Sequence, residues 1–239
     1  MSDKVLKKED PPRRKRGRPE GRTAAGAATR ARLFDEACVM LAEVGYAGMT
    51  LRALAERAEL SAGAVYKHFP NKAAIVLALY EDLSRRFAEE VSLPSGPWRL
   101  RFEAALDSSI STLAPHRDTL AELVPVLVGD RAQGLFAEGT AFARARVEGV
   151  FLDVARHGRP KPSNPDALGR VLYTVHLAVI LFWLLDRSPA QRATDELRAL
   201  LAQALPPAAL ALRVPGASRV LSRLSRLIEE GLLGLSGTP

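Results

Sequence analysis

The sequence contains a single cysteine, Cys38, so an intrachain disulfide is excluded and a reducing compartment is favoured. Cys38 lies in an apolar helical pattern beside Phe34 and Leu41, which favours a core residue over a redox sensor. Four histidines are scattered along the chain without a metal-ligand spacing, and the motifs G-x-S-x-G, the P-loop and H-E-x-x-H are missing. We therefore expect no metal ion, no cofactor and no catalytic site.

Long hydrophobic runs are also scarce. Residues 171–185 form one apolar run of 15 residues that includes His176, whereas a helix that spans a bilayer needs about 20. This run is therefore interpreted as a buried bundle helix. The charges near the amino terminus are followed by no apolar run, so no secretory signal is expected. Together these features predict a cytoplasmic protein without a membrane partner.

Positive charge is concentrated at one end of the chain. Residues 1–30 hold ten Lys or Arg and four Asp or Glu, which accounts for +6 of the formal net charge of +7. An excess charge confined to one segment indicates a polyanionic partner and says little about the fold. Residues 1–23, rich in Pro, Gly, Arg and Lys, are predicted to form a disordered basic arm.

The rest of the chain has helical periodicity, with no convincing alternation of period two and no fixed repeat, so an all-α fold is expected. The Pro- and Gly-rich segment 92–97 marks the best internal boundary. It separates a small three-helix unit within residues 24–90 from a larger helical bundle at residues 91–239. In the bundle, helices are expected near residues 98–113, 118–128, 133–157, 166–187, 189–205 and 217–234, with Ser188, Pro189 and Gln191 forming a capping box at the fifth of them.

Two short helices in the small unit have the arrangement of a helix-turn-helix, in which the second helix enters the DNA major groove. Thr50 and Ser61 are placed as their N-caps. Val65 and Phe69 fall on the inward face of the second helix. The alternative from spacing alone is an ordinary helical hairpin, with Tyr66 covering the core and a solvated charge at Lys67.

The order of residues favours the first interpretation. Residues 29–80 resemble the TetR family of bacterial transcriptional regulators. The resemblance is carried by T-x-x-x-I/L-A at Thr50, Leu54 and Ala55, and by S-x-G-x-x-Y-x-H-F-x-x-K at Ser61, Gly63, Tyr66, His68, Phe69 and Lys72. One departure is Glu59, at a turn position where the family commonly has glycine. We expect its carboxylate to point away from the duplex.

The resemblance implies DNA contacts from Thr50, Arg52, Ser61, Ala62, Gly63, Tyr66, Lys67, His68 and Lys72. Ala62, Gly63 and Lys67 would face the groove. Tyr66, His68 and Lys72 would clamp the phosphate backbone. Because alanine and glycine offer little hydrogen bonding, direct base readout would rest on Arg52 and Lys67, with the remainder coming from DNA shape.

The basic arm contains Arg16, Gly17, Arg18 and Pro19, which resemble an AT-hook. In such a motif, arginines enter the narrow minor groove of A/T-rich DNA. Minor-groove insertion of Arg16 and Arg18, non-specific attraction to phosphate and a merely solvated tail all remain open.

For residues 91–239 the resemblance implies a ligand-binding and dimerisation domain. Candidate pocket residues are Phe102, Phe136, Phe142, Tyr173 and His176, and the effector would then be small and largely apolar. Candidate dimer contacts are Leu177, Ile180, Trp183, Leu184, Leu197 and Leu201. In both sets the alternative is plain internal core. The amphipathic helix expected at residues 217–234 would cover the bundle or, alternatively, lie on a membrane surface.

The sequence therefore predicts a homodimeric regulator, not an enzyme, that binds a palindromic double-stranded DNA operator, most simply as a repressor released by a ligand. A two-fold pair is required because one short helix reads too few bases. The alternative from another class is an all-helical interaction or scaffold protein with a non-functional helix-turn-helix, and a helical-bundle enzyme comes third.

Overall fold

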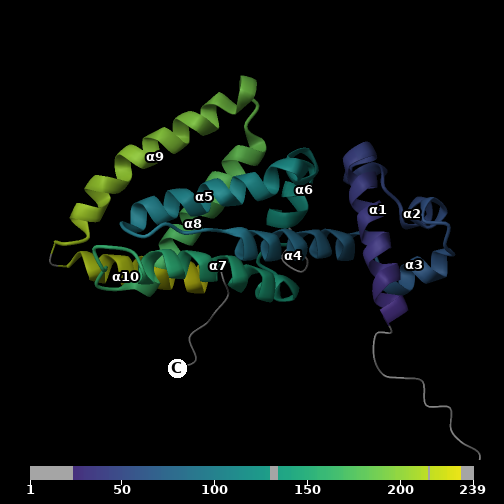
Figure 1. Ribbon diagram of the computed structural model, residues 1–239, viewed down its shortest axis with the longest axis horizontal. Helices are drawn as coiled ribbons and strands as arrows, with labels where there is room; N and C mark the ends of the chain where they lie inside the picture. The colour runs from purple at the N-terminus through teal and green to yellow at the C-terminus, as the bar shows by residue number, and fades with distance from the viewer. Residues whose placement is uncertain (1–23, 130–133, 215, 233–239) are drawn as a thin grey trace, which may run out of the picture.

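The computed structural model describes residues 24–129, 134–214 and 216–232, and in these ranges the protein is helical, without a β-strand, as predicted. The small amino-terminal helices lie at one end and a larger bundle at the other, with α4 running between them (Figure 1). The helices are α1 (Ala24–Gly48), α2 (Leu51–Arg57), α3 (Ala62–His68), α4 (Lys72–Glu90), α5 (Trp98–Leu113), α6 (Arg117–Gly129), α7 (Ala141–Arg156), α8 (Pro165–Leu185), α9 (Arg192–Ala211) and α10 (Ala217–Gly231).

Side-chain caps begin α2, α3 and α4, and the caps of α2 and α3 are those that the sequence predicts. The hydroxyl of Thr50 accepts a hydrogen bond from Ala53 N at 3.1 Å, at the start of α2. Ser61 caps α3 by accepting from the backbone N–H three residues later at 3.2 Å. Asn71 caps α4 in the same way, at 2.9 Å. Each cap satisfies a backbone N–H that the helix itself leaves without a partner.

The hydrophobic interior forms two clusters that meet along α4. The first joins α1, α2, α3 and the first half of α4, and it extends onto α6 through Leu123 and onto α8 through Trp183. The second cluster begins at Phe87 and fills the space among α5, α7, α8 and α10. The helix α4 is therefore shared between the two units, and the division at residue 90 stays a proposal. Cys38 packs against the first cluster, where burial raises the pKa of its thiol to about 11.

The start of α9 differs from the predicted capping box. Gln191 adopts a left-handed backbone with φ of 58°, and its Oε1 accepts a hydrogen bond from Trp183 Nε1 at 2.6 Å. The hydroxyl of Ser188, the predicted N-cap, accepts from the backbone N–H of Ala193 at 2.9 Å. Asp186 adds a second capping oxygen, because its Oδ2 accepts from the backbone N–H of Thr194 at 2.9 Å and from its hydroxyl at 2.7 Å. These bonds hold the pKa of Asp186 well below its usual range. The helix α9 also extends to Ala211, beyond the predicted end.

The helix α8 is the apolar run of the sequence, and by length and composition it is the one described helix that could cross a membrane. In the fold it packs against α7, α10 and α6, as expected for a bundle helix. Gly169 permits the close approach to α7, since a Cβ there would lie 2.8 Å from the Cα of Leu152. The helix α10 covers α8, where Arg170 and Glu229 form an ion pair at 2.7 Å.

The helix α7 begins later than predicted. It starts at Ala141, after a short 3₁₀ turn at residues 138–140, and the predicted start at residue 133 lies outside the described residues. The hydroxyl of Thr140 donates to nearby backbone carbonyls, including that of Leu135 at 2.8 Å. Arg144 reaches back to the same carbonyl at 3.0 Å. These bonds satisfy the turn carbonyls locally, which a continuous helix would otherwise have done.

Candidate functional site

The turn between α2 and α3 is held by backbone hydrogen bonds. Leu60 N donates to Ala55 O at 2.9 Å, and Arg32 of α1 donates to Ala58 O at 3.1 Å. Glu59 occupies the left-handed region with φ of 53°, where the family commonly has glycine. This conformation costs a non-glycine residue about 1–2 kcal/mol. The turn geometry is therefore kept by its surroundings without the glycine.

The helix α3 is anchored on one face and exposed on the other. Val65 and Phe69 are fully buried in the first cluster, and the guanidinium of Arg30 lies 4.8 Å from the centre of the Phe69 ring. Of the residues predicted to face DNA, six are exposed: Thr50, Arg52, Ser61, Gly63, Tyr66 and Lys67. Ala62 and His68 are only half-buried at the edges of this face. The arm with Arg16 and Arg18 lies outside the described residues.

Lys72, at the start of α4, contacts the end of α1. Its Nζ donates to Tyr46 O at 2.8 Å and lies 4.5 Å from the centre of the Tyr46 ring. The α1 backbone leaves the helical conformation at Gly45, so carbonyls after this break need another donor. The ammonium group therefore ties the start of α4 to the end of α1. Because it has three N–H donors, its contact with phosphate stays a prediction.

Arg57 is a further cation near the site whose role the sequence analysis missed. It donates to Glu36 at 2.8 Å and also pairs with Glu43, both on α1. The hydrogen bond from Arg57 lowers the pKa of Glu43. Arg57 therefore fixes α2 on α1. Among the exposed cations of α2 and α3, this leaves Arg52 and Lys67 without an ion pair to any described residue.

A second site is a partly open cavity of about 300 Å³ between α4, α5, α6, α7 and α8, which Leu135, Phe136 and Leu232 also line. Two of the predicted pocket residues, Phe136 and His176, line it. Phe102 and Tyr173 are instead buried in the adjoining aromatic cluster around Phe151. Phe142 lies on the surface with 72% of its area exposed, because it sits at the exposed start of α7.

His176 is the most unusual group in the cavity wall. Its Nε2 lies 2.8 Å from the hydroxyl of Ser109, and its ring centre lies 4.6 Å from that of Phe151. Its Nδ1 has no hydrogen-bond partner among the described residues. Burial lowers the pKa of His176 to about 3, so the imidazole is neutral at physiological pH.

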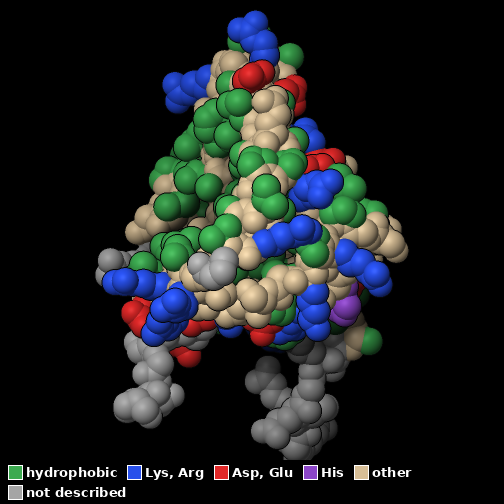
Figure 2. Space-filling view, turned by 90° about the vertical axis from the view of Figure 1, so that its left-hand side faces the viewer, with side chains coloured by type: hydrophobic (Ala, Val, Ile, Leu, Met, Phe, Trp, Pro, Cys, Tyr) green, Lys and Arg blue, Asp and Glu red, His purple; other side chains and the backbone are tan. Residues whose placement is uncertain are grey.

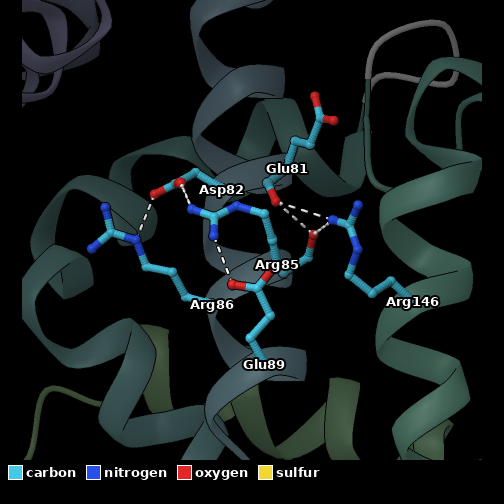
Figure 3. A network of polar contacts seen from close by, with 7 residues as sticks. Glu81, Asp82, Arg85, Arg86, Glu89 and Arg146 are labelled. Atoms are coloured by element: carbon cyan, nitrogen blue, oxygen red, sulfur yellow. Dashed lines mark hydrogen bonds and ion pairs between the residues drawn. The ribbon is translucent and has the colours of Figure 1, made fainter. Parts of the chain in front are cut away.

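The wall formed by α4 is mostly apolar towards the cavity and charged on its outer face. On the outer face, Asp82 pairs with Arg85 and Arg86 at 2.7 Å each (Figure 3). From α7, Arg146 donates to Ser84 Oγ at 2.9 Å and to Glu81 O at 3.3 Å. These contacts join α7 to α4 beside the cavity, so the two walls are held together by polar bonds as well as by packing.

The predicted dimer residues on α8 and α9 face inward. Trp183 and Leu184 are buried, and Leu177, Ile180, Leu197 and Leu201 are half-buried against the cores. The exposed apolar residues of these two helices are Phe182, Leu185, Leu200 and Leu210. Figure 2 shows hydrophobic side chains gathered along the upper part of the molecule, which α8 and α9 form. Period alone does not say which side of an apolar helix meets the core, so the dimer contacts of these residues stay a prediction.

Two short capped helices, the second anchored by buried side chains and presenting small, aromatic and basic residues outward, define a helix-turn-helix DNA-binding protein. Residues 33–79 match the family described as bacterial regulatory proteins, tetR family.

Curated relatives share this assignment. The transcriptional repressor KstR of Rhodococcus jostii is 28% identical over 173 residues, which cover 70% of this chain and 78% of that protein. KstR of Mycobacterium tuberculosis is 25% identical over 175 residues, which cover 70% and 76% of the two chains.

Solved structures show the same fold. A tetR-family regulator from Streptomyces coelicolor has a TM-score of 0.58 and 19% identity, covering 87% of this chain and 93% of that one. A TetR regulator from Nitrosomonas europaea has a TM-score of 0.54 and 20% identity, covering 77% and 99%. The chain is a DNA-binding transcriptional regulator of the TetR family.

Proposed function

We propose that this protein is a cytoplasmic, homodimeric repressor that binds a palindromic operator and is released by a small, largely apolar effector. The observation that carries the proposal is the exposed face of α3, held by Val65 and Phe69 while Tyr66 and Lys67 project outward. The apolar cavity in the second bundle supports the effector. A regulator of this kind acts by binding, so we propose neither a catalytic step nor a cofactor.

The roles within the DNA interface follow from residue chemistry. Arg52 and Lys67 are proposed to contact base edges, since both are exposed cations that no described carboxylate engages. Thr50, Ser61 and Tyr66 are proposed to contact phosphate, which fixes the register of the helix on the duplex. Ala62, Gly63 and His68 border the same face. Arg16 and Arg18 of the arm would add minor-groove or phosphate contacts.

The first prediction concerns Tyr66, which is 49% exposed on α3. Tyr66→Ala is expected to weaken operator binding about tenfold per protomer, because one hydrogen bond to a charged oxygen is lost at each half-site. The measurement is fluorescence anisotropy with duplexes that tile the DNA upstream of the protein's own gene, at several salt concentrations. Phe142→Ala, which removes another exposed aromatic ring outside this face, is the matched control and should bind as wild type does.

Different outcomes separate the candidate functions. Selective binding to one palindromic tile, weakened on all tiles by Tyr66→Ala, supports the regulator. Binding without preference among tiles and indifferent to Tyr66 would favour the alternative, a helical interaction protein with a basic arm.

The second prediction concerns the dimer. We propose that the exposed apolar residues of α8 and α9, including Phe182 and Leu200, meet their symmetry mates in a two-fold interface. Phe182→Glu and Leu200→Glu are expected to convert the dimer to monomer, because each buries two unpaired carboxylates at the contact. Light scattering coupled to size exclusion would measure the mass. Phe142→Glu, on α7, should remain dimeric, and a mass unchanged by both interface variants would contradict this interface.

The route from effector to DNA is proposed to pass through α6. One side of this helix lines the cavity through Leu120 and Val124. On another side, Glu122 Oε2 accepts a hydrogen bond from Tyr46 N at 3.1 Å, at the break in α1. The first residue of α6, Arg117, donates to Trp183 O at 2.9 Å. A ligand that prefers a shifted α6 would thereby favour a different placement of the helix-turn-helix.

A further inference from the structure

The cavity is lined almost wholly by hydrocarbon, and its described wall contains no Lys, Arg, Asp or Glu side chain. Its volume of about 300 Å³ is at the lower end for small-molecule pockets. A buried carboxylate or phosphate without a cation would lose its hydration and gain no ion pair, which is strongly unfavourable. The part of the cavity wall that the described residues form is therefore suited to an uncharged molecule.

Besides Ser109 and His176, the side chains of Tyr80, Ser84 and Thr174 bring polar groups to this wall, and the last two already have local partners. The hydroxyl of Thr174 donates to Arg170 O at 3.0 Å. Ser84 Oγ donates to Glu81 O at 2.9 Å and accepts from Arg146 at 2.9 Å. These groups have little need of a ligand.

The pair formed by Ser109 and His176 is different. Both side chains are at least 96% buried, both line the cavity, and the Nδ1 atom of His176 is left without a partner among the described residues. If Ser109 donates to Nε2, the serine oxygen can still accept a hydrogen bond. If Nε2 donates to Ser109, the serine hydroxyl can still donate. In either tautomer of neutral histidine, a ligand hydroxyl can complete the pair. A ligand carbonyl can accept a hydrogen bond from Nδ1–H of His176 in the first tautomer and from the serine hydroxyl in the second.

We propose that the effector is an un-ionised, predominantly hydrocarbon molecule that carries one hydroxyl or carbonyl group, hydrogen-bonded to the pair formed by Ser109 and His176. This inference rests on the proposed function only in treating the cavity as the effector site. It adds the chemistry of recognition: shape and hydrocarbon contact supply affinity, and one buried pair selects a neutral polar group.

The test uses the full-length protein and three probes with the same number of carbons: octane, octanol and octanoate. Octanol and octanoate are titrated by calorimetry without DNA, and octane is measured by competition against octanol. Octanol is expected to bind about tenfold more tightly than octane, as one buried hydrogen bond provides. Octanoate at neutral pH is expected to bind at least a hundredfold more weakly than octanol.

Variants test whether Ser109 and His176 cause the preference for octanol over octane. Ser109→Ala and His176→Phe are both expected to reduce the advantage of octanol over octane to about twofold or less, while Thr174→Val, the matched hydroxyl control, keeps it. Circular dichroism and thermal melting check that each variant is folded. Tighter binding of octanoate than of octanol, absence of octanol binding by the wild type, or a preference that survives in both variants would overturn the inference.

The proposed function fails by a different measurement. If the wild-type protein shows no selective operator binding in the anisotropy experiment, the proposed repressor function is refuted and the calorimetric result is unaffected. Conversely, selective operator binding with no preference for octanol would retain the regulator and remove the assigned effector chemistry.

Discussion

Gly45→Ala is expected to lower the free energy of unfolding by about 1–3 kcal/mol. Gly45 has φ of 69°, in the left-handed region that side chains rarely adopt, and a Cβ there would collide with the carboxylate of Glu122. The new methyl group would therefore strain the backbone and displace Glu122 from Tyr46 N. Urea denaturation measures the loss. Gly149→Ala, in the middle of α7 with open space around it, should instead be neutral or stabilising.

A double-mutant cycle separates the two causes. Glu122→Ala removes the collision but not the backbone strain, so the double variant should recover part of the loss caused by Gly45→Ala alone. If the hydrogen bond between Glu122 and Tyr46 N also transmits the effect of the effector, the Glu122→Ala variant should still bind the operator. Octanol should then release less DNA from this variant than from the wild type. Equal costs for Gly45→Ala and Gly149→Ala would contradict the strain assigned to the α1 break.

His176→Phe is expected to flatten the dependence of stability on pH in mildly acidic solution. The pKa of His176 is lowered by burial from 6.5 to about 3. Below pH 6.5 the unfolded chain therefore binds a proton that the folded protein does not. Stability is complete above pH 6.5 and falls as the pH falls towards 3. At about 1.4 kcal/mol per pH unit, the wild type should lose about 2–3 kcal/mol near pH 4.5 through this group.

The matched control is Tyr173→Phe. Tyr173 lies in the same aromatic cluster, with its ring centre 6.3 Å from that of His176, and burial raises the pKa of its phenol. Its removal should leave the acid slope unchanged, since no proton is gained or lost by it in this range. Chemical denaturation at a series of pH values gives the slopes. A wild-type slope that persists in His176→Phe would show that another group causes the acid loss.

In each of these two predictions, one residue has a signal in the sequence and its partner does not. A glycine at position 45, after the apolar helical pattern of residues 33–44, is a local signal for a helix stop. Its collision partner, Glu122, is 77 positions away and carries no local signal, so only the fold could bring the two together. His176 was identified as a polar residue on an apolar helix. Its pairing with Ser109 of α5 depends on how α5 and α8 cross.

The same division applies to the site residues. Local chemistry determined the caps at Thr50 and Ser61, the inward direction of Val65 and Phe69, and the order of residues that marks the family. These features depend on neighbours within a few positions, where spacing is decisive. The hydrogen bond from Lys72 to the carbonyl of Tyr46 could not be predicted in this way, since the two residues are 26 positions apart in the sequence.

By itself, the sequence determined that this protein is helical, that it contains a capped helix-turn-helix of the TetR type, and that its excess charge lies in one arm. Only the tertiary structure decided which faces of α8 and α9 are exposed, which aromatic rings border the cavity, and which helix links that cavity to α1. The physical reason is that helix periodicity fixes directions within one helix, whereas burial, collisions and buried polar pairs depend on several helices packed together.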